Sequence, residues 1–378
     1  MTKKLTYSPL TSRTLTLRKP LGSHKQSNDY KGRIYTLKGT PFEIGYAMGQ
    51  SLGARLEVNI ERYVQARVSL GDTLNVAAWR SGALPWLRAL PARFLEEFEG
   101  LAQGAKLPLP RLAEWAYLEV LLAGGCSGAI ITWPTSGQTA PHAWVARNND
   151  IFAPGMWGYV TIREIPGRIP SISFGLEGDV FTPTGINQDK LWLHYNYLPA
   201  WDTPLTDRPH LPAYAFMVEA LETCRTLQEL EALLRRIQRD DGMLLFAVEG
   251  KTNAYALYEC GCTDFYKREP TQGWLVGTNH YCIHPQAPPP RSAGPRSTVS
   301  RYKQMGSLIE ARVSQGGDAP PVKALIQILA DPAIEAREGD IVTTYANVAC
   351  PSTGELWYTF GGYPAASCGN WQKLAWPW

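Results

Sequence analysis

The stretch LLAGGCSGAII, residues 121–131, marks a change in the character of this 378-residue sequence. Before it, apolar residues recur at helical spacing. After it, short apolar runs alternate with Gly, Pro, Asn and Asp, a pattern typical of strands joined by turns. Cys126 stands at the boundary, directly after two glycines. The stretch therefore predicts that a helical region ends here and that a strand begins at Cys126.

The region upstream of Cys126 is predicted to be mainly helical. In residues 33–64, a strand-like alternation is followed by Pro41 and then by an apolar repeat at four-residue spacing, which predicts a strand and then a helix. The repeat consists of Ile44, Met48, Leu52 and Leu56. Two further helical patterns are bounded by Pro or Gly. Residues 1–30 are rich in Ser, Thr and Lys and are interpreted as a loosely held N-terminal arm.

Downstream of Cys126, blocks of strands alternate with pairs of helices. Thr226 and Glu229 have capping-box spacing at the start of one of these helices. The blocks lack the strict βαβα rhythm of a doubly wound parallel sheet, so they predict an α+β fold in which antiparallel sheets pack together under helix pairs. The expected helices cover 212–224, 226–238, 298–315 and 321–331. The expected strands cover 126–133, 142–150, 157–165, 171–178, 190–198, 243–250, 253–260, 264–270, 273–281, 340–350 and 355–362.

Composition excludes several classes of function. The chain carries 37 basic and 34 acidic residues, a net charge of +3, without long runs of one sign, so neither nucleic acid nor a membrane surface is a predicted partner. No apolar run is long enough for a membrane span or resembles a signal-peptide core, which predicts a soluble, cytoplasmic protein. Seven cysteines without regular spacing predict free thiols rather than a disulfide framework.

Motifs for other chemistries are missing from the sequence. It contains no phosphate-binding or dinucleotide-binding glycine loop, no Gly-x-Ser-x-Gly and no His-Glu-x-x-His. Cys260, Cys262, Cys282 and His284 could in principle hold zinc, but their spacing does not match common zinc motifs. No metal or cofactor is therefore predicted, and a metal-binding module stays an alternative.

The pair Gly125-Cys126 has its own chemistry. A thiol can attack the carbonyl that precedes it, and glycine there leaves the approach free of a Cβ. Hydrolysis of the resulting thioester would cut the chain and free the α-amino group of Cys126, whose usual pKa of about 7.7–8.0 suits a general base. The alternative is a buried structural cysteine that follows a glycine turn.

Further motifs follow in a defined order: GTPFEIGYAMGQSLG before Cys126, then ARNNDIF, GINQDKLWLHYNY, GTNHY and STVSRYKQM. The series resembles the acyl-coenzyme A:6-aminopenicillanic acid acyltransferase family, relatives of choloylglycine hydrolase among the N-terminal-nucleophile hydrolases, from about residue 34 to about residue 360. The resemblance implies a four-layer αββα fold with self-cleavage before Cys126. Residues 31–125 would then form a small, mainly helical chain that stays associated with the catalytic chain 126–378 in one integrated domain.

The resemblance also implies roles for the residues nearest the nucleophile. Cys126 resembles the family nucleophile, and Gly125 would end the small chain. Asp150 resembles the aspartate that holds the freed α-ammonium group, and Arg147 the arginine that lowers the pKa of the thiol. The alternative for Arg147 and Asp150 is an ordinary salt bridge at a strand end.

Three later residues complete the implied site. Asn279 resembles the oxyanion-hole asparagine, whose NH₂ would face the developing negative charge. Asn196 resembles a second asparagine of the bile-salt relatives. Asn187, which resembles a turn residue of the family, is the alternative for this assignment. Arg301 resembles an arginine near the nucleophile on a late helix, with a solvated helix arginine as the alternative.

Together these features predict a self-processing cysteine amidohydrolase that cleaves a linear N-acyl amide through an acyl-Cys126 intermediate. An acyltransferase that moves an acyl group from a thioester or an amide to an amine is the first alternative. A non-catalytic binding scaffold of the same fold is the second. The expected partner is a small-molecule N-acyl amide or acyl thioester, and self-association into a homo-oligomer is left open.

Overall fold

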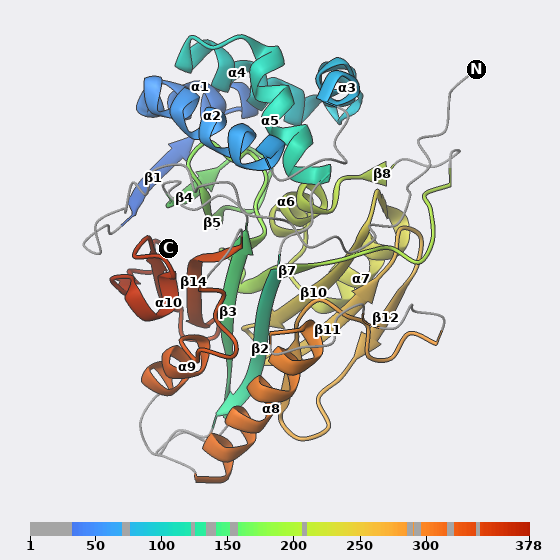
Figure 1. Ribbon diagram of the computed structural model, residues 1–378, viewed down its shortest axis with the longest axis vertical. Coiled ribbons are helices and arrows are strands. Elements are labelled where there is room, and N and C mark those ends of the chain that lie inside the picture. The colour runs from blue at the N-terminus through green and yellow to red at the C-terminus, as the bar shows by residue number, and fades with distance from the viewer. Residues whose placement is uncertain are drawn as a thin grey trace.

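The computed structural model describes residues 32–69, 76–121, 125–133, 141–151, 158–205, 210–285, 290, 296–315, 321–337 and 341–378 (Figure 1). The arm predicted over residues 1–30 lies outside the described residues. The switch at Cys126 is confirmed: helix α5 (Leu109–Leu121) precedes strand β2 (Gly125–Trp133).

Two sheets form the centre of the molecule. Sheet A has the strand order β1-β4-β5-β6-β7-β10-β11-β12, and sheet B the order β13-β2-β3-β14-β15-β16. The strands of sheet A are β1 (Arg33–Lys38), β4 (Gly158–Glu164), β5 (Ser171–Leu176), β6 (Thr184–Asn187), β7 (Leu191–Leu198), β10 (Gly242–Glu249), β11 (Ala254–Cys260) and β12 (Phe265–Arg268). Those of sheet B are β2, β3 (His142–Ile151), β13 (Trp274–Gly277), β14 (Val342–Cys350), β15 (Glu355–Phe360) and β16 (Gln372–Leu374). Within both sheets every pairing is antiparallel except that of β1 with β4.

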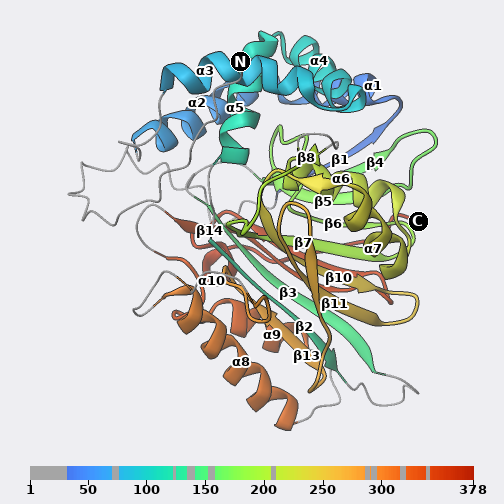
Figure 2. The same cartoon turned by 90° about the vertical axis from the view of Figure 1, so that its right-hand side faces the viewer.

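Helices lie outside both sheets. Upstream of Cys126, α1 (Pro41–Leu52), α2 (Ala54–Ser69), α3 (Val76–Ala89), α4 (Ala92–Ala105) and α5 gather at one end of the molecule and are called the helical cap below (Figures 1 and 2). The others are α6 (Ala213–Thr223), α7 (Leu227–Arg236), α8 (Thr298–Gln315), α9 (Val322–Leu329) and α10 (Ala365–Cys368). A short parallel pair, β8 (His210–Leu211) and β9 (Gln238–Arg239), completes the described elements.

Three clusters of buried apolar side chains separate four layers. The first joins the helical cap, α6 and α7 to the outer face of sheet A. The second fills the space between the two sheets, and the third joins sheet B to α8, α9 and α10. Helix, sheet, sheet and helix therefore follow one another, which confirms the predicted α+β fold with its αββα layers.

The glycine motif upstream of Cys126 is explained by helix packing. Gly45 and Gly49 of α1 cross Gly100 and Gly104 of α4 at backbone contact. A Cβ at Gly45 would lie 2.0 Å from the Glu97 carbonyl oxygen, and one at Gly104 would lie 2.1 Å from the Tyr46 carbonyl oxygen. Only glycine permits so close a crossing, so the repeat GxxxG in each helix fixes how the helical cap assembles.

Candidate functional site

Cys126 lies on the face of sheet B that looks toward sheet A, called the inner face below. Side chains alternate along a strand, and Ile130, four residues on, belongs to the core between the sheets. The pairing register places three rows of side chains on this face of β2, β3 and β14: Cys126, Asn149 and Tyr345; Gly128, Arg147 and Asn347; Ile130, Val145 and Ala349. Two polar rows thus lie above an apolar one, and Cys126 opens the first.

Arg147 reaches from the second row into the first. Its side chain is fully buried, and its Nη2 lies 3.6 Å from Cys126 Sγ and 3.0 Å from Asn149 Oδ1. Nη2 also donates to the Tyr195 carbonyl oxygen at 2.6 Å. The register therefore brings a guanidinium group to the thiol. The role of Arg147 in lowering the pKa of the thiol stays a prediction.

Asp150 and Arg301 lie beside the main chain of Cys126. Asp150 points away from the inner face, so it does not form the strand-end salt bridge with Arg147 that was the alternative. Its Oδ2 lies 3.7 Å from Arg301 Nη1, and its Oδ1 accepts from Thr343 Oγ1 at 2.6 Å. Arg301 is 9% exposed and donates from Nη1 to the Cys126 carbonyl oxygen at 2.7 Å, so it is not a solvated helix arginine.

Asn279 follows strand β13 and contacts the nitrogen of Cys126. Its Oδ1 accepts from Cys126 N at 3.0 Å and from Arg301 Nη2 at 2.8 Å. Two donors at one atom identify that atom as the amide oxygen. The NH₂ group donates to the Tyr197 carbonyl oxygen at 2.9 Å, so in this arrangement it is not directed at the thiol. The oxyanion-hole role of Asn279 stays a prediction.

The two competing asparagines have different surroundings. Asn196 is fully buried, and its Nδ2 donates to the carbonyl oxygens of Gly277 and Thr278 at 3.3 and 3.1 Å, so it contacts the segment that leads to Asn279. Asn187 instead bonds Leu191 N and two carbonyl oxygens near the end of α6. Asn187 therefore has a structural role in a turn, while any catalytic role of Asn196 stays a prediction.

Burial sets the protonation of the site. Burial raises the pKa of the Cys126 thiol above its usual range, although Arg147 opposes the shift. Burial also raises the pKa of Asp150 to about 6, against the opposing effects of Arg301 and the Thr343 hydrogen bond. A thiol that keeps its proton at neutral pH needs a base before it can attack.

Several residues around the site carried no signal in the sequence. Thr184 and Tyr345 both accept from Arg147 Nη1. Glu259, fully buried, accepts from the main-chain nitrogens of Cys282, Ile283 and His284 at 2.8–3.3 Å and so fixes the segment after Asn279. Only the pairing of distant strands brings these residues together, and period-two alternation alone does not reveal it.

The alternative zinc site does not form. Cys260 Sγ lies 3.7 Å from the Tyr258 carbonyl oxygen, and Cys262 Sγ lies 3.4 Å from that of Asp202, while Cys282 is exposed. Among the residues that the structure describes, no group of three or more His, Cys, Asp or Glu side chains could hold a metal ion.

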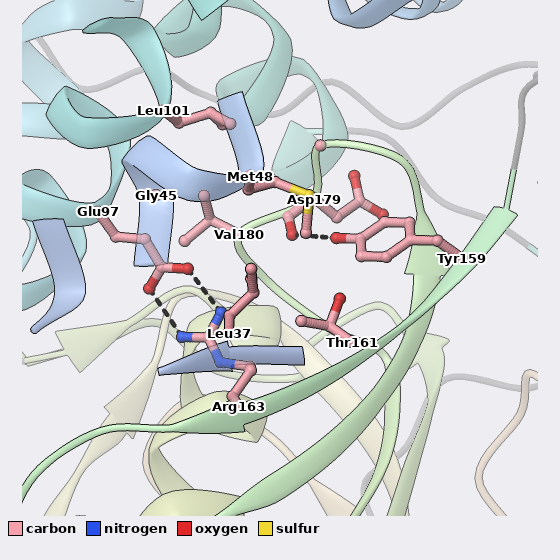
Figure 3. A pocket seen from close by; sticks show the side chains of 11 residues that line it. Leu37, Gly45, Met48, Glu97, Leu101, Tyr159, Thr161, Arg163, Asp179 and Val180 are labelled. Atoms are coloured by element: carbon pink, nitrogen blue, oxygen red, sulfur yellow. Dashed lines mark hydrogen bonds and ion pairs between the residues drawn. The ribbon is translucent and has the colours of Figure 1, made fainter. Parts of the chain in front are cut away.

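A separate small cavity lies between the helical cap and sheet A (Figure 3). The cavity has a volume of about 10 Å³, room for about one water molecule. Met48 and Leu101 supply apolar walls, and the pair of Glu97 and Arg163 lies at one side of it. None of the residues around Cys126 lines this cavity.

Comparison with known proteins gives structural likenesses at low identity. No protein-family model matches the sequence, and no curated protein matches it. A mutant form of conjugated bile acid hydrolase from Clostridium perfringens aligns with a TM-score of 0.47 and 12% identity over 66% of this chain and 96% of that one. Penicillin V acylase from Agrobacterium tumefaciens gives 0.47 and 12% over 65% and 86%. An N-acylethanolamine-hydrolyzing acid amidase ortholog from Caenorhabditis elegans gives 0.42 and 13% over 60% and 93%.

These likenesses assign neither a family nor an activity to the chain.

In the described part of the chain, no helix is long and apolar enough to span a membrane.

Proposed function

We propose that this chain is a cysteine amidohydrolase that cleaves a linear N-acyl amide through an acyl-Cys126 intermediate, after cutting itself between Gly125 and Cys126. The observation that carries the proposal is the convergence of Arg147, Asn279 and Arg301 on the thiol, nitrogen and carbonyl oxygen of one residue at the start of a strand. A structural cysteine in an apolar core needs none of these partners.

Self-cleavage begins with attack of Cys126 Sγ on the Gly125 carbonyl carbon. A thioester forms while the carbon–nitrogen bond breaks, the Cys126 nitrogen takes up a proton, and water then hydrolyses the thioester. A Cβ at position 125 would lie 3.6 Å from Asp150 Cβ, an ordinary contact, so packing does not require glycine there. The open approach to the carbonyl supplies a chemical reason for glycine.

The freed α-amino group then serves as the base that the raised pKa of the thiol requires. It stays where Cys126 N is held, 3.0 Å from Asn279 Oδ1. In catalysis Sγ attacks the substrate carbonyl, the amine takes the thiol proton and passes it to the leaving nitrogen, and the acyl thioester is hydrolysed by water. Nucleophile and base then belong to one residue, so no histidine partner is needed.

Denaturing intact-mass spectrometry of the purified wild-type chain beside Cys126→Ala tests the proposal. Fragments 1–125 and 126–378 in the wild-type sample, with a single uncut mutant chain, are expected. One uncut chain in both samples would contradict self-activation and would favour a non-catalytic scaffold of the same fold.

Acyl transfer is the second candidate, because an amine in place of water would resolve the same acyl-Cys126 intermediate. Supplying a cleaved amide together with a primary amine distinguishes the two. A free acid as the main product supports hydrolysis, and a new amide supports transfer. A small-molecule substrate, a cytoplasmic location and continued association of the two fragments belong to this proposal.

A further inference from the structure

We propose that Tyr345 is a positioning residue of this site: its hydroxyl group, with that of Thr184, holds the Arg147 guanidinium against the Cys126 thiol. The inference rests on the proposed function, in which Cys126 is the nucleophile.

The first argument is the geometry around Arg147 Nη1. This nitrogen donates to Tyr345 Oη at 2.8 Å and to Thr184 Oγ1, and the two hydroxyl oxygens lie 3.0 Å apart. A terminal guanidinium nitrogen carries two hydrogens, so these two acceptors account for both. With Nη1 held in this way, the planar group presents Nη2 to Cys126 Sγ at 3.6 Å.

The second argument is that the two hydroxyl groups that hold Arg147 come from different sheets. Tyr345 belongs to the same row of sheet B as Cys126, whereas Thr184 begins β6 of sheet A. Thr184 is itself held in place by Thr182. Thr182 Oγ1 donates to the Thr184 carbonyl oxygen at 2.7 Å and accepts from the Thr184 nitrogen at 3.2 Å. The guanidinium is therefore held from both sides of the space between the sheets.

The third argument separates the hydroxyl group from the ring. The Tyr345 ring packs against Phe360 with 5.5 Å between centroids, a contact that phenylalanine would keep. Loss of the hydroxyl alone leaves an N–H of Arg147 without that acceptor in a fully buried place, and a buried donor without a partner is unfavourable. The guanidinium then turns toward other acceptors and away from the thiol.

The pKa of Cys126 reports this movement. The titratable groups whose charges act on Cys126 or respond to it are Arg147, Asp150, Tyr195, Tyr214, Arg301 and Tyr345. Burial raises the pKa of Tyr345 to about 12, so Tyr345→Phe removes no charge below about pH 10. A change in the pKa of Cys126 in that variant therefore reports the position of Arg147.

The experiment measures the rate at which iodoacetamide alkylates Cys126, as a function of pH, in the full chain. Trypsin yields a Cys126 peptide of residues 112–147 from the uncut chain and 126–147 from the cut chain, so mass spectrometry follows each form separately and ignores the other six cysteines. Tyr345→Phe and Thr184→Val are compared with Tyr358→Phe and Thr184→Ser. Tyr358 is the matched control, because it is a buried tyrosine of β15 in the same core between the sheets.

Tyr345→Phe and Thr184→Val are expected to raise the apparent pKa of Cys126 and to slow alkylation near pH 7.5 by about three- to tenfold. Tyr358→Phe and Thr184→Ser are expected to match the wild type. Equal profiles for Tyr345→Phe and Tyr358→Phe would overturn the inference and leave the proposed function intact. If Tyr345→Phe fails to fold, the comparison of Thr184→Val with Thr184→Ser tests the inference instead, and equal profiles for these two variants would overturn it. A wild-type Cys126 that stays unreactive at every pH would overturn both.

Discussion

Arg147 and Arg163 are both buried arginines on sheet strands, 0% and 5% exposed, yet their surroundings differ. Arg163 of β4 forms a bidentate pair with Glu97 of the helical cap at 2.6 and 2.7 Å (Figure 3). Its Nε lies 3.3 Å from Glu222 of α6. The contacts described for Arg147 are a thiol, an amide, two hydroxyl groups and a main-chain carbonyl.

The two arginines differ in whether neighbouring carboxylates balance their positive charge. Burial lowers the pKa of Arg163, but the carboxylates of Glu97 and Glu222 more than offset it, so the pKa is raised. That cluster is electrically compensated and joins the helical cap to sheet A. Arg147 has no carboxylate among these contacts, so its positive charge is available to stabilise negative charge at Cys126.

The largest expected effect is on stability, and it separates the two arginines. In a Cys126→Ala background, Arg163→Met leaves Glu97 buried without its bidentate partner, while Glu222 keeps Arg93. This change is expected to lower the free energy of unfolding by about 3–5 kcal/mol. Arg147→Met leaves only neutral groups without a donor and is expected to cost about 1–2 kcal/mol. Urea denaturation of the uncut chains checks both values. Equal losses would show that the two clusters do not differ in this way.

The next effect concerns Asp150, whose only ion pair among the described residues is the 3.7 Å contact with Arg301. Burial raises its pKa to about 6 in the folded chain, against about 3.9 unfolded. The folded state therefore binds the extra proton between these values, and stability is lost as the pH rises through that window.

Relative to Cys126→Ala/Asp150→Asn, the Cys126→Ala chain should thus lose about 2–3 kcal/mol between about pH 4 and pH 6. Urea midpoints of both chains across this range provide the measurement. A difference that stays constant with pH would mean that Asp150 is already compensated, as Glu97 is.

Much of the fold follows from local patterns. The strand at Cys126, the strand that carries Arg147 and Asp150, and the helix capped by Thr226, whose hydroxyl accepts from Glu229 N at 3.1 Å, were predicted because periodicity and capping depend on neighbouring residues. The layer order was implied by the resemblance and is confirmed by the three core clusters.

The rest of the site depends on pairings that local patterns do not encode. Tyr345 lies in a predicted strand, but its place in the row of Cys126 depends on an irregularity between Thr343 and Tyr345 that shifts the register. Thr184 begins a four-residue strand that was not predicted, since it is too short for a clear alternation. The orientation of the Asn279 amide is likewise set by Arg301, which is 22 residues away in sequence.

A smaller effect, on the reactivity of Cys126, is expected when a carboxylate is placed beside Arg147, as Glu97 lies beside Arg163. Asn149→Asp places a carboxylate 3.0 Å from Arg147 Nη2 and 3.8 Å from Cys126 Sγ. It should compensate Arg147 and repel the thiolate, so Cys126 alkylation at neutral pH should slow by about tenfold while stability is kept. Asn148→Asp, on the other face of β3, is the control for added charge. Unchanged alkylation in Asn149→Asp would mean that Arg147 does not act on the thiol.

The smallest effect is expected at Asn347, the neighbour of Arg147 in the second polar row. It is fully buried, and neither its Oδ1 nor its Nδ2 has a hydrogen-bond partner among the described residues. Replacing a buried amide without a partner by an apolar side chain of similar size removes a desolvation cost, so Asn347→Leu should change the free energy of unfolding by less than about 1 kcal/mol or raise it. Thermal denaturation in the Cys126→Ala background measures the change. A loss of several kcal/mol would instead show that Asn347 forms a hydrogen bond with an internal water molecule. The buried polar groups near Cys126 would then be satisfied by water, whereas the charge of Arg163 is balanced by the carboxylates of Glu97 and Glu222.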